Sequence, residues 1–335
     1  MNRKERIMAA LHGKEVDRVP VSAWLHFSEV DQDPVSLAKA QISFVKKYDF
    51  DFIKMMPQGT YPVQDWGAQL KIYANKMHEP IILEPGIKCI EDYGKLDILP
   101  PFYGTWGKTL QLAKRMQEFN DADIPYIQTV FSPLTILSKL TNGHVYEDMR
   151  SNPDVVEKAL KVVAATNIAF VLENLRYGVS GFFFATQSAG EDLMSLDEFN
   201  HFARPYDLEV IESYKDKTYF NVLHIHGDNV RFKDLLDYPV NCLSWHARST
   251  YPSLKEAREM TDKCFLGGVK EDPYFVDGAL HYNSIMATGS EQDIINHVKE
   301  AIAQVDGRGL IIGPSCVIDP RTDENSYYAL RKSVE

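Results

Sequence analysis

The chain has 335 residues, of which 44% are hydrophobic and 25% charged, and its formal net charge at pH 7 is −11. It contains no apolar stretch of about 20 residues, which argues against a membrane-spanning helix, and no basic stretch long enough to follow a phosphate backbone, which argues against nucleic-acid binding. Its four cysteines form no CxxC pair, and its first residues lack the apolar core of a signal peptide. We therefore expect free thiols and a cytoplasmic location.

Short runs rich in β-branched and aromatic residues alternate with longer helical patterns along the whole chain. In chain order, the predicted strands are Val19–His26, Phe50–Met56, Tyr126–Phe131, Gly181–Thr186, Phe220–His226, Cys242–His246, Cys264–Val269 and Leu310–Gly313. This alternation is typical of βαβ units and a parallel sheet. Eight strands favour a (β/α)8 TIM barrel, formed by one domain over residues 1–335, because no GxGxxG or GxxxxGK[ST] loop of an open doubly wound sheet occurs.

The predicted helices carry start and stop signals of their own. Asn152-Pro153 starts one helix, and Ser195-Leu-Asp-Glu198 has the form of a capping box that opens another. Pro205 is expected to kink or interrupt that second helix, and Ser290 precedes a further helix. Residues 61–101 are rich in Pro and Gly, which predicts loops or a short hairpin inserted after the second strand.

In barrels of this kind, the chemistry lies at the C-terminal ends of the strands. We therefore expect the active site there and treat the residues at those ends as candidates. The substrate-binding candidates are Trp24, His26, Met56, Phe131, Trp245 and Lys270. We assign catalytic roles to His246, Gln187 and Glu191. His246 can equally be a fourth metal ligand or a hydrogen-bonded pocket histidine, and Glu191 can equally belong to a solvated loop.

His224 and His226 are the most informative pair in the chain. Side chains alternate along a strand, so both imidazoles leave the same face. Cys316 follows the last predicted strand and is expected to reach the same mouth. Two imidazoles and one thiolate make a three-ligand zinc site with an open fourth position, which is the mark of a catalytic metal. Alone, a His-x-His pair is often only hydrogen-bonded and a lone cysteine is often only packed, so the hypothesis rests on their joint placement.

Several segments resemble the uroporphyrinogen decarboxylase superfamily. They are Arg3-Lys-Glu-Arg-Ile-Met-Ala-Ala-Leu-His-Gly13 with Asp17-Arg-Val-Pro-Val21, Gly181-Phe-Phe-Phe-Ala-Thr-Gln187, Leu223-His-Ile-His-Gly227, Leu243-Ser-Trp-His246, Leu266-Gly-Gly-Val269 and Gly313-Pro-Ser-Cys316. The resemblance runs nearly from end to end and implies a (β/α)8 barrel.

The resemblance implies one of two chemistries. The decarboxylase branch holds an acidic tetrapyrrole with an arginine-rich segment after the first strand and an aspartate after the second. Here those places read Ser-Ala-Trp-Leu-His-Phe-Ser and Lys54-Met-Met-Pro-Gln58, without the arginines or the aspartate. Decarboxylation of a tetrapyrrole is therefore disfavoured.

The second branch is similar to zinc-dependent methyltransferases that work with corrinoid proteins, such as methylcobamide:coenzyme M methyltransferase. Its metal motif is His-x-Cys with a distant Cys, so the resemblance implies ligand roles for His224 and Cys316. His226 stands where the family has its first cysteine. Replacing a thiolate by a neutral imidazole makes the centre more positive, which favours a Lewis acid over an activated thiolate.

These observations predict a zinc-dependent methyltransferase that moves a methyl group between a small methylated substrate and a cobamide on a partner corrinoid protein. The substrate is of the ether or thiol type, and both directions of transfer stay open. Two other classes also stay open. One is a carboxy-lyase that holds a carboxylated substrate with Lys54 and Lys270, and the other is a non-catalytic zinc- or corrinoid-binding protein.

Overall fold

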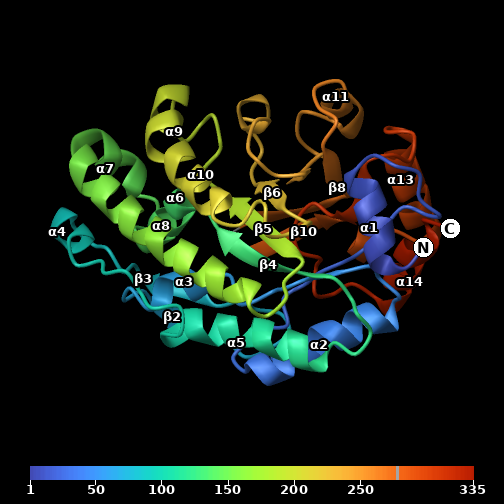
Figure 1. The fold of residues 1–335 in the computed structure, drawn as a ribbon, viewed down its shortest axis with the longest axis horizontal. Helices are drawn as coiled ribbons and strands as arrows, with labels where there is room; N and C mark the ends of the chain where they lie inside the picture. Colours follow the sequence, from blue (N-terminus) through green and yellow to red (C-terminus); the bar gives the residue numbers. More distant parts are fainter. Residues whose placement is uncertain (277–278) are drawn as a thin grey trace.

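The computed structural model describes residues 1–276 and 279–335 (Figure 1). Within that part of the chain, a seven-stranded sheet has the order β1-β4-β5-β6-β7-β8-β11, and every neighbouring pair is parallel. Its strands are β1 (Ile53–Lys54), β4 (Tyr126–Phe131), β5 (Gly181–Thr186), β6 (Val222–Ile225), β7 (Cys242–Trp245), β8 (Cys264–Val269) and β11 (Leu310–Pro314). The predicted α/β class and parallel sheet are therefore confirmed.

The first predicted strand, Val19–His26, is not formed as a strand. Val21 makes one isolated parallel bridge with Ile312 of β11. Around it, the Ser22 backbone N donates to the Ile312 O at 2.9 Å, and the Asp51 N donates to the Val21 O at 2.8 Å. Pro20 has no N–H to extend the ladder. The eighth strand expected from the sequence is thus reduced to a short segment that contacts both edges of the sheet.

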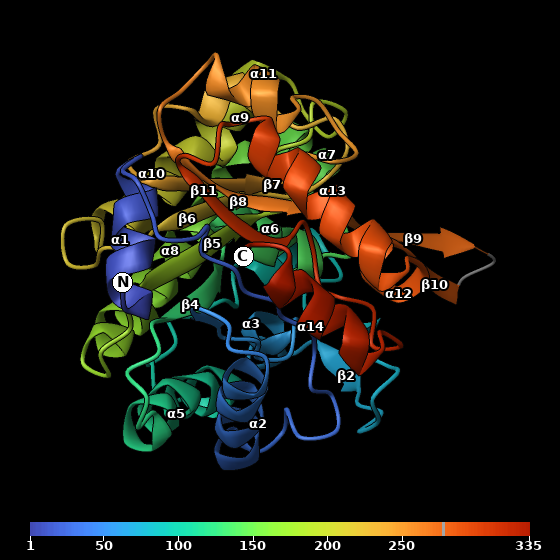
Figure 2. The same cartoon turned by 90° about the vertical axis from the view of Figure 1, so that its right-hand side faces the viewer.

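Two helices precede β1, and the others lie between or after the strands in chain order; most of them surround the sheet (Figures 1 and 2). They are α1 (Arg3–Leu11), α2 (Pro34–Lys47), α3 (Tyr61–Gln64), α4 (Ile90–Tyr93), α5 (Gly104–Phe119), α6 (Pro133–Leu140), α7 (Val145–Ser151), α8 (Pro153–Leu175), α9 (Leu196–Phe202), α10 (Arg204–Glu212), the 3-10 helix η1 (Lys233–Leu235), α11 (Leu254–Arg258), α12 (Ile285–Thr288), α13 (Glu291–Ala303) and α14 (Glu324–Lys332). In the described chain, no helix is long and apolar enough to cross a membrane.

The predicted helix signals are confirmed. The side chain of Ser195 caps α9 and that of Ser290 caps α13, each in a capping box with an acidic residue three positions later. The interruption expected at Pro205 separates α9 from α10, which starts at Arg204. Proline fits at the start of α10 because the first helical positions have no intrahelical partner for their N–H groups.

Two antiparallel hairpins stand apart from the main sheet. Strands β2 (Gln69–Lys71) and β3 (Ile81–Glu84) pair within the segment predicted as an inserted hairpin, together with α3 and α4. Strands β9 (Glu271–Val276) and β10 (Ala279–Ser284) follow β8 directly and project beside α12 (Figure 2). The first hairpin brings Glu79 and Pro80 to the C-terminal end of the sheet, where they line a cavity.

Candidate metal centre and substrate cavity

Three histidines meet at the C-terminal ends of β6 and β7. One ligand nitrogen from each of His224, His226 and His246 lies within 4.8 Å of the other two. The His246 Nε2 and His226 Nδ1 are 3.3 Å apart. Neighbouring nitrogens around a tetrahedral zinc, with bonds of about 2.0–2.1 Å, are roughly 3.3 Å apart. The donor set and the spacing of this one pair therefore fit a zinc ion.

Strand register explains why the third member is His246. His224 of β6 is paired with Ser244 of β7, and its Nδ1 lies 3.2 Å from the Ser244 Oγ. Because side chains alternate with a period of two, the next inward positions on the two chains are His226 and His246. The cluster is thus formed by two adjacent parallel strands at the same level.

The protonation states of these histidines suit metal binding. Burial lowers the pKa of His224 well below its ordinary value, and His226, His246 and Lys54 lower it further. Burial and the neighbouring His246 lower the pKa of His226 to about 3. Both imidazoles are therefore neutral at physiological pH and keep a free lone pair, which metal binding requires.

Asp272 fixes the orientation of His246. The His246 Nδ1 lies 3.1 Å from the Asp272 Oδ1, and Ser249 donates a hydrogen bond to the other carboxylate oxygen. Burial disfavours the carboxylate, but the hydrogen bonds from His246 and Ser249 still hold the pKa of Asp272 below its ordinary value. A carboxylate can only accept, so the proton is on Nδ1 and the lone pair of Nε2 faces the cluster.

A cavity of about 430 Å³ lies beside the cluster. His224 and His226 form one part of its wall, and aromatic rings form much of the rest. The other lining residues used below are Trp24, His26, Lys54, Met56, Thr60, Glu79, Phe131, Lys139, Phe183, Gln187 and Cys316. This volume suits a small molecule, because ligand pockets typically measure about 300–1,000 Å³.

Two lysines place positive charge in this cavity. Lys54 is 7% exposed, and burial lowers its pKa to about 7. Burial also lowers the pKa of Lys139, which lies in the last turn of α6. The carboxylate of Glu79 lies 3.0 Å from the His26 Nε2, but burial lowers the pKa of that imidazole. The charge of Glu79 also acts on both lysines and raises the pKa of each.

Most of the predicted site residues come together around this cavity. Trp24, His26, Met56, Phe131 and Gln187 line it, as do His224, His226 and Cys316. His246, predicted as a catalytic residue or a fourth ligand, joins the three-histidine cluster. Cys316 is in the cavity wall but outside that cluster, and burial raises the pKa of its thiol to about 12. Its role as a metal ligand stays a prediction.

Three predicted site residues lie neither in the cavity wall nor in the histidine cluster. Trp245 points to the other face of β7, is 1% exposed and donates from its indole nitrogen to the Pro252 O at 2.7 Å. The period of two that turns His246 inward turns its neighbour outward. Lys270 lies near Asp272, with 4.0 Å between Nζ and Oδ2. Glu191 is exposed, on a loop that is bonded to Asn229.

The structure also adds residues that sequence reasoning missed. Asp272 follows β8 two residues after Lys270, and only the fold shows that it contacts His246. Lys139 comes from α6 and Glu79 from the β2–β3 hairpin, and no sequence pattern connects either one to a strand end. Lys54 was not missed, since the sequence names it as a cation for a carboxylated substrate, and the structure has it in the cavity wall.

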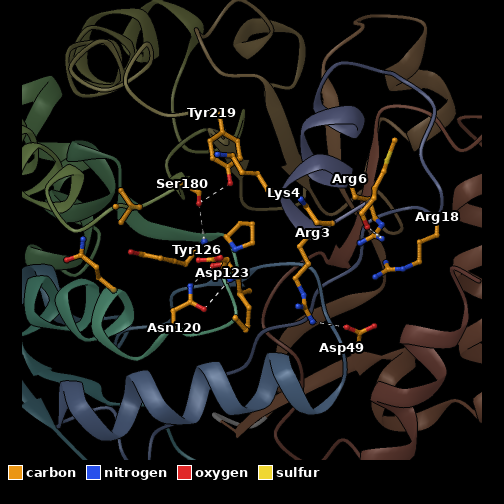
Figure 3. Close-up of a pocket in the computed structure, with 18 of the residues that line it drawn as sticks. Arg3, Lys4, Arg6, Arg18, Asp49, Asn120, Asp123, Tyr126, Ser180 and Tyr219 are labelled. Carbon is orange, nitrogen blue, oxygen red and sulfur yellow. Dashed lines mark hydrogen bonds and ion pairs between the residues drawn. The ribbon is translucent and has the colours of Figure 1, made fainter.

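A larger cavity of about 940 Å³ lies at the opposite, N-terminal end of the strands (Figure 3). Arg3, Arg6, Arg18 and Arg331 line it. Each of these four arginines forms an ion pair with a carboxylate. Arg3 and Arg331 share the carboxylate of Asp49, and Arg6 and Arg18 share that of Asp51. These four arginines are thus all paired within the protein, and none of the three clustered histidines is in the cavity wall.

Comparisons with known proteins point to one family. The family model described as Uroporphyrinogen decarboxylase (URO-D) matches residues 2–335. A methylcobamide:CoM methyltransferase MtbA of Methanosarcina mazei is 21% identical over 258 residues, which cover 72% of this chain and 75% of that protein. A methylcobamide:CoM methyltransferase MtbA of Methanosarcina acetivorans is 21% identical over an alignment of 349 residues, which covers 99% and 96% of the two chains.

Solved structures agree with this fold. A methyltransferase from Methanosarcina mazei superposes with a TM-score of 0.80 at 22% identity, and the match covers 99% of this chain and 98% of that one. A B12-independent methionine synthase from Shewanella sp. W3-18-1 in complex with selenomethionine gives a TM-score of 0.58 at 14% identity over 93% and 92% of the chains. At these identities, the structural likeness establishes the fold alone.

Proposed function

We propose, on the premise that this chain belongs to the uroporphyrinogen decarboxylase family, that it is a zinc-dependent methyltransferase. It would move a methyl group between a small methylated substrate and a cobamide carried by a partner corrinoid protein. The observation that carries the proposal is the cluster of His224, His226 and His246 beside the 430 Å³ cavity. The names of the MtbA relatives support the corrinoid-linked reaction.

In this proposal the whole chain, residues 1–335, acts as one domain around the cavity. The bonds from Ser22 to Ile312 and from Asp51 to Val21 support a sheet that residues 20–22 close into a (β/α)8 barrel. The active site then lies at the C-terminal mouth, where catalytic residues of such barrels are found. That mouth is also the face on which a corrinoid protein would dock.

His224, His226 and His246 would hold the zinc ion, and Cys316 would complete or exchange with this set. When bound, zinc supplies a Lewis acid at its open coordination position. The protein's own residues prepare that position. Asp272 keeps the proton of His246 on Nδ1, Ser244 orients His224, and the rings of Trp24, Phe131 and Phe183 exclude water from the substrate.

The ligand set favours one direction of transfer. Three neutral imidazoles leave the charge of the metal uncompensated by the protein, whereas thiolates neutralise it. A more positive centre suits polarisation of the leaving atom of a methylated substrate rather than activation of an acceptor thiolate. Demethylation of a small ether-type substrate is therefore the favoured reaction, and methyl transfer to a thiol is its alternative.

Metal analysis together with a methyl-transfer assay tests this function. We expect the purified chain to bind about one zinc per molecule and to change the cobalt–alkyl absorption of methylcobalamin with a suitable acceptor, or of reduced cobalamin with an aryl methyl ether. His224→Ala should abolish both properties. His144→Ala removes an exposed histidine and should change neither. A folded chain that never retains zinc, with His224→Ala fully active, would contradict the proposal.

Cobalt substitution separates the two candidate ligand sets. A thiolate ligand gives Co(II) an intense charge-transfer absorption in the near ultraviolet, and an all-imidazole set does not. If His246 is the third ligand, His246→Ala should lose the metal and Cys316→Ser should keep both the metal and the spectrum. If Cys316 is the third ligand, the two variants should behave in the opposite way.

A carboxy-lyase is the second candidate, and one observation favours it. Lys54 and Lys139 line the cavity, and cations of this kind are what a carboxylated substrate needs. The two functions differ in their dependence on metal and cobamide. Release of CO₂ from a carboxylate by the metal-free chain, without any cobalt–alkyl change, would favour the lyase.

A further inference from the structure

The hydroxyl of Ser315 is bonded to both backbone groups of one distant residue, Glu271. It accepts a hydrogen bond from the Glu271 N at 3.0 Å and donates one to the Glu271 O at 2.9 Å. A hydroxyl has one donor and two acceptor lone pairs, so this arrangement uses it on both sides. Ser315 is 1% exposed. We call these two bonds the Ser315–Glu271 link.

This link continues the connection between β8 and β11 beyond the end of the sheet. The last paired residues of the two strands are Val269 and Pro314, and the Ser315 N donates to the Val269 O at 3.0 Å. The side chain of Ser315 then bonds to Glu271, the first residue of β9. One buried hydroxyl therefore holds the segment that leaves β11 against the segment that leaves β8.

Each of the two linked residues directly precedes a residue of the candidate site. Cys316 follows Ser315, and Asp272 follows Glu271. The Glu271 O belongs to the planar peptide group that joins Glu271 to Asp272, so the bond from Ser315 restrains the backbone of Asp272. The Asp272 carboxylate lies in turn 3.1 Å from the His246 Nδ1. A continuous series of contacts thus leads from Ser315 to an imidazole of the histidine cluster.

The side chain of Glu271 anchors this series from the other side. Its Oε1 accepts hydrogen bonds from the Ser284 Oγ at 2.7 Å and from the Met286 N at 3.3 Å. Ser284 also caps α12, because its side chain accepts from the Ala287 N. Glu271 and Ser284 are both buried. The backbone around Asp272 is therefore held between the end of β11 and the start of α12.

We infer that Ser315 and Glu271 are positioning residues of the proposed metal centre. The link between them holds Asp272 in place, and Asp272 holds the imidazole of His246 in the orientation that faces the cluster. This inference rests on the proposed function for the role of His246 as a zinc ligand. Outer residues of this kind matter because the affinity for a metal depends on how its ligands are oriented.

Proton NMR of the metal-free, full-length chain tests the link directly. An imidazole N–H proton that is bonded to a carboxylate resonates far downfield and exchanges slowly with water while the bond is held. We expect such a signal in the wild-type chain and its loss in His246→Ala. Ser315→Ala removes two buried hydrogen bonds, so the proton should exchange roughly tenfold faster. Absence of the signal in the wild-type chain, or unchanged exchange in folded Ser315→Ala, would overturn the inference.

A double-mutant cycle shows whether Ser315 acts through Asp272. Ser315→Ala should weaken zinc binding about tenfold, as measured by competition with a chelator. The double variant Ser315→Ala/Asp272→Asn should bind zinc about as tightly as Asp272→Asn alone, because residues that act along one path have non-additive effects. Fully additive losses would mean that Ser315 affects the metal independently, which contradicts the inference.

Two variants of Glu271 distinguish position from charge. Glu271→Gln keeps an oxygen for the bonds from Ser284 and Met286, so zinc affinity should stay close to that of the wild-type chain. Glu271→Ala removes that anchor and should lower the affinity roughly tenfold. An equal loss in both variants would mean that the negative charge of Glu271 attracts the metal, and its positioning role would be wrong.

Ser333→Ala is the matched control for Ser315→Ala. Ser333 is also 1% exposed and also donates to a backbone carbonyl, the Leu330 O at 2.6 Å, but it follows α14. Its removal should lower the free energy of unfolding and leave both the downfield signal and zinc affinity unchanged. If Ser333→Ala weakened zinc binding as much as Ser315→Ala, general loss of stability would explain both, and the inference would fall.

The same experiments separate this inference from the proposed function, because the NMR measurement needs no metal. If the chain binds zinc and transfers methyl groups but Ser315→Ala changes neither proton exchange nor zinc affinity, the inference alone fails. If proton exchange depends on Ser315 but the chain binds no zinc and transfers no methyl group, the proposed function alone fails.

Discussion

The two ends of the parallel strands differ in how their buried charged side chains are paired. At the N-terminal end, Arg6 and Arg18 share the fully buried carboxylate of Asp51 at 2.7 and 2.6 Å. At the C-terminal end, Lys54 and Lys139 line a cavity whose one acidic lining residue in the described chain, Glu79, is bonded to His26. The first arrangement has direct ion pairs, whereas among the described residues the two lysines of the second have none.

Cavity volume alone would favour the N-terminal end over the end proposed as the active site. The N-terminal cavity has about 940 Å³ and the C-terminal one about 430 Å³. What distinguishes the smaller cavity is the set of groups that have unused bonding capacity, namely the neutral histidines, the lysines and the Thr60 hydroxyl. Paired charge indicates stability, and unpaired buried charge indicates function.

Asp51→Ala should give the largest effect on stability. The Asp51 carboxylate accepts bonds from Arg6, Arg18 and the Val21 N at 2.8 Å, so its removal leaves buried guanidinium groups without a partner. We expect the free energy of unfolding to fall by about 3–5 kcal/mol, as measured by denaturant titration. Zinc binding by the folded fraction should not change. Glu29→Ala, which removes an exposed carboxylate, is the control.

If Asp51→Ala instead left stability intact and reduced zinc binding or methyl transfer, the N-terminal network would have a functional role. The division between the two ends would then be wrong.

Much of the fold was predictable because the central strands are continuous apolar runs. The bounds expected for β4, β5 and β8 match the structure residue for residue, and β11 differs by one residue. The first strand failed where the chain carries Pro20, which removes a donor from the ladder. Pro20 is visible in the sequence, but the β-branched residues on either side of it favour a strand.

The sequence could predict the site residues that lie on strands, but not those that come from helices or from the inserted hairpin. His224 and His226 follow from the period of two alone, whereas the inclusion of His246 depends on the register between β6 and β7. Residue Lys139 sits on a helix and Glu79 on an inserted hairpin, and both reach the cavity through tertiary packing. Trp245 was wrongly predicted to face the cavity, because residues at a strand end alternate between the two faces of the sheet and only every second one faces inward.

Asp272→Asn should weaken the metal centre without unfolding the protein. The carboxylate fixes the tautomer and orientation of His246, and loss of such a partner typically lowers metal affinity about 10- to 100-fold. Competition with a zinc chelator measures this change. Glu300→Gln, which alters an exposed partner of Arg248, should leave the affinity within about twofold. Unchanged zinc affinity in Asp272→Asn would exclude His246 as a ligand.

Lys54→Met should stabilise the metal-free protein, in contrast to Asp51→Ala. It replaces a buried, uncompensated charge by an apolar side chain of similar length, and we expect a gain of about 1–2 kcal/mol at pH 6. The groups that face Lys54 are Trp24 and Phe183, with Glu79 and Cys316 as its electrostatic neighbours.

The gain from Lys54→Met should shrink as the pH rises. Burial lowers the pKa of Lys54 from 10.5 to about 7, so below pH 7 the lysine is charged in both folded and unfolded chains and the full penalty is present. Between pH 7 and 10.5 the unfolded chain binds the additional proton, and the wild-type protein therefore gains stability with pH. Denaturant titrations at pH 6 and pH 9 measure both values. A loss of stability in Lys54→Met at pH 6 would mean that the lysine has a partner within the protein.

The smallest effect is expected from Lys4→Met in the N-terminal cavity. Lys4 is exposed, and the arginines around it are paired with carboxylates (Figure 3), so neither the fold nor those pairs depend on Lys4. We expect the free energy of unfolding to change by less than about 0.5 kcal/mol, with zinc binding and methyl transfer unchanged. Titration of inorganic phosphate into this variant and the wild-type chain is the sharper measurement. Phosphate binding that depends on Lys4 would show that the paired arginines still attract anions, and unpaired charge would then no longer distinguish the two ends.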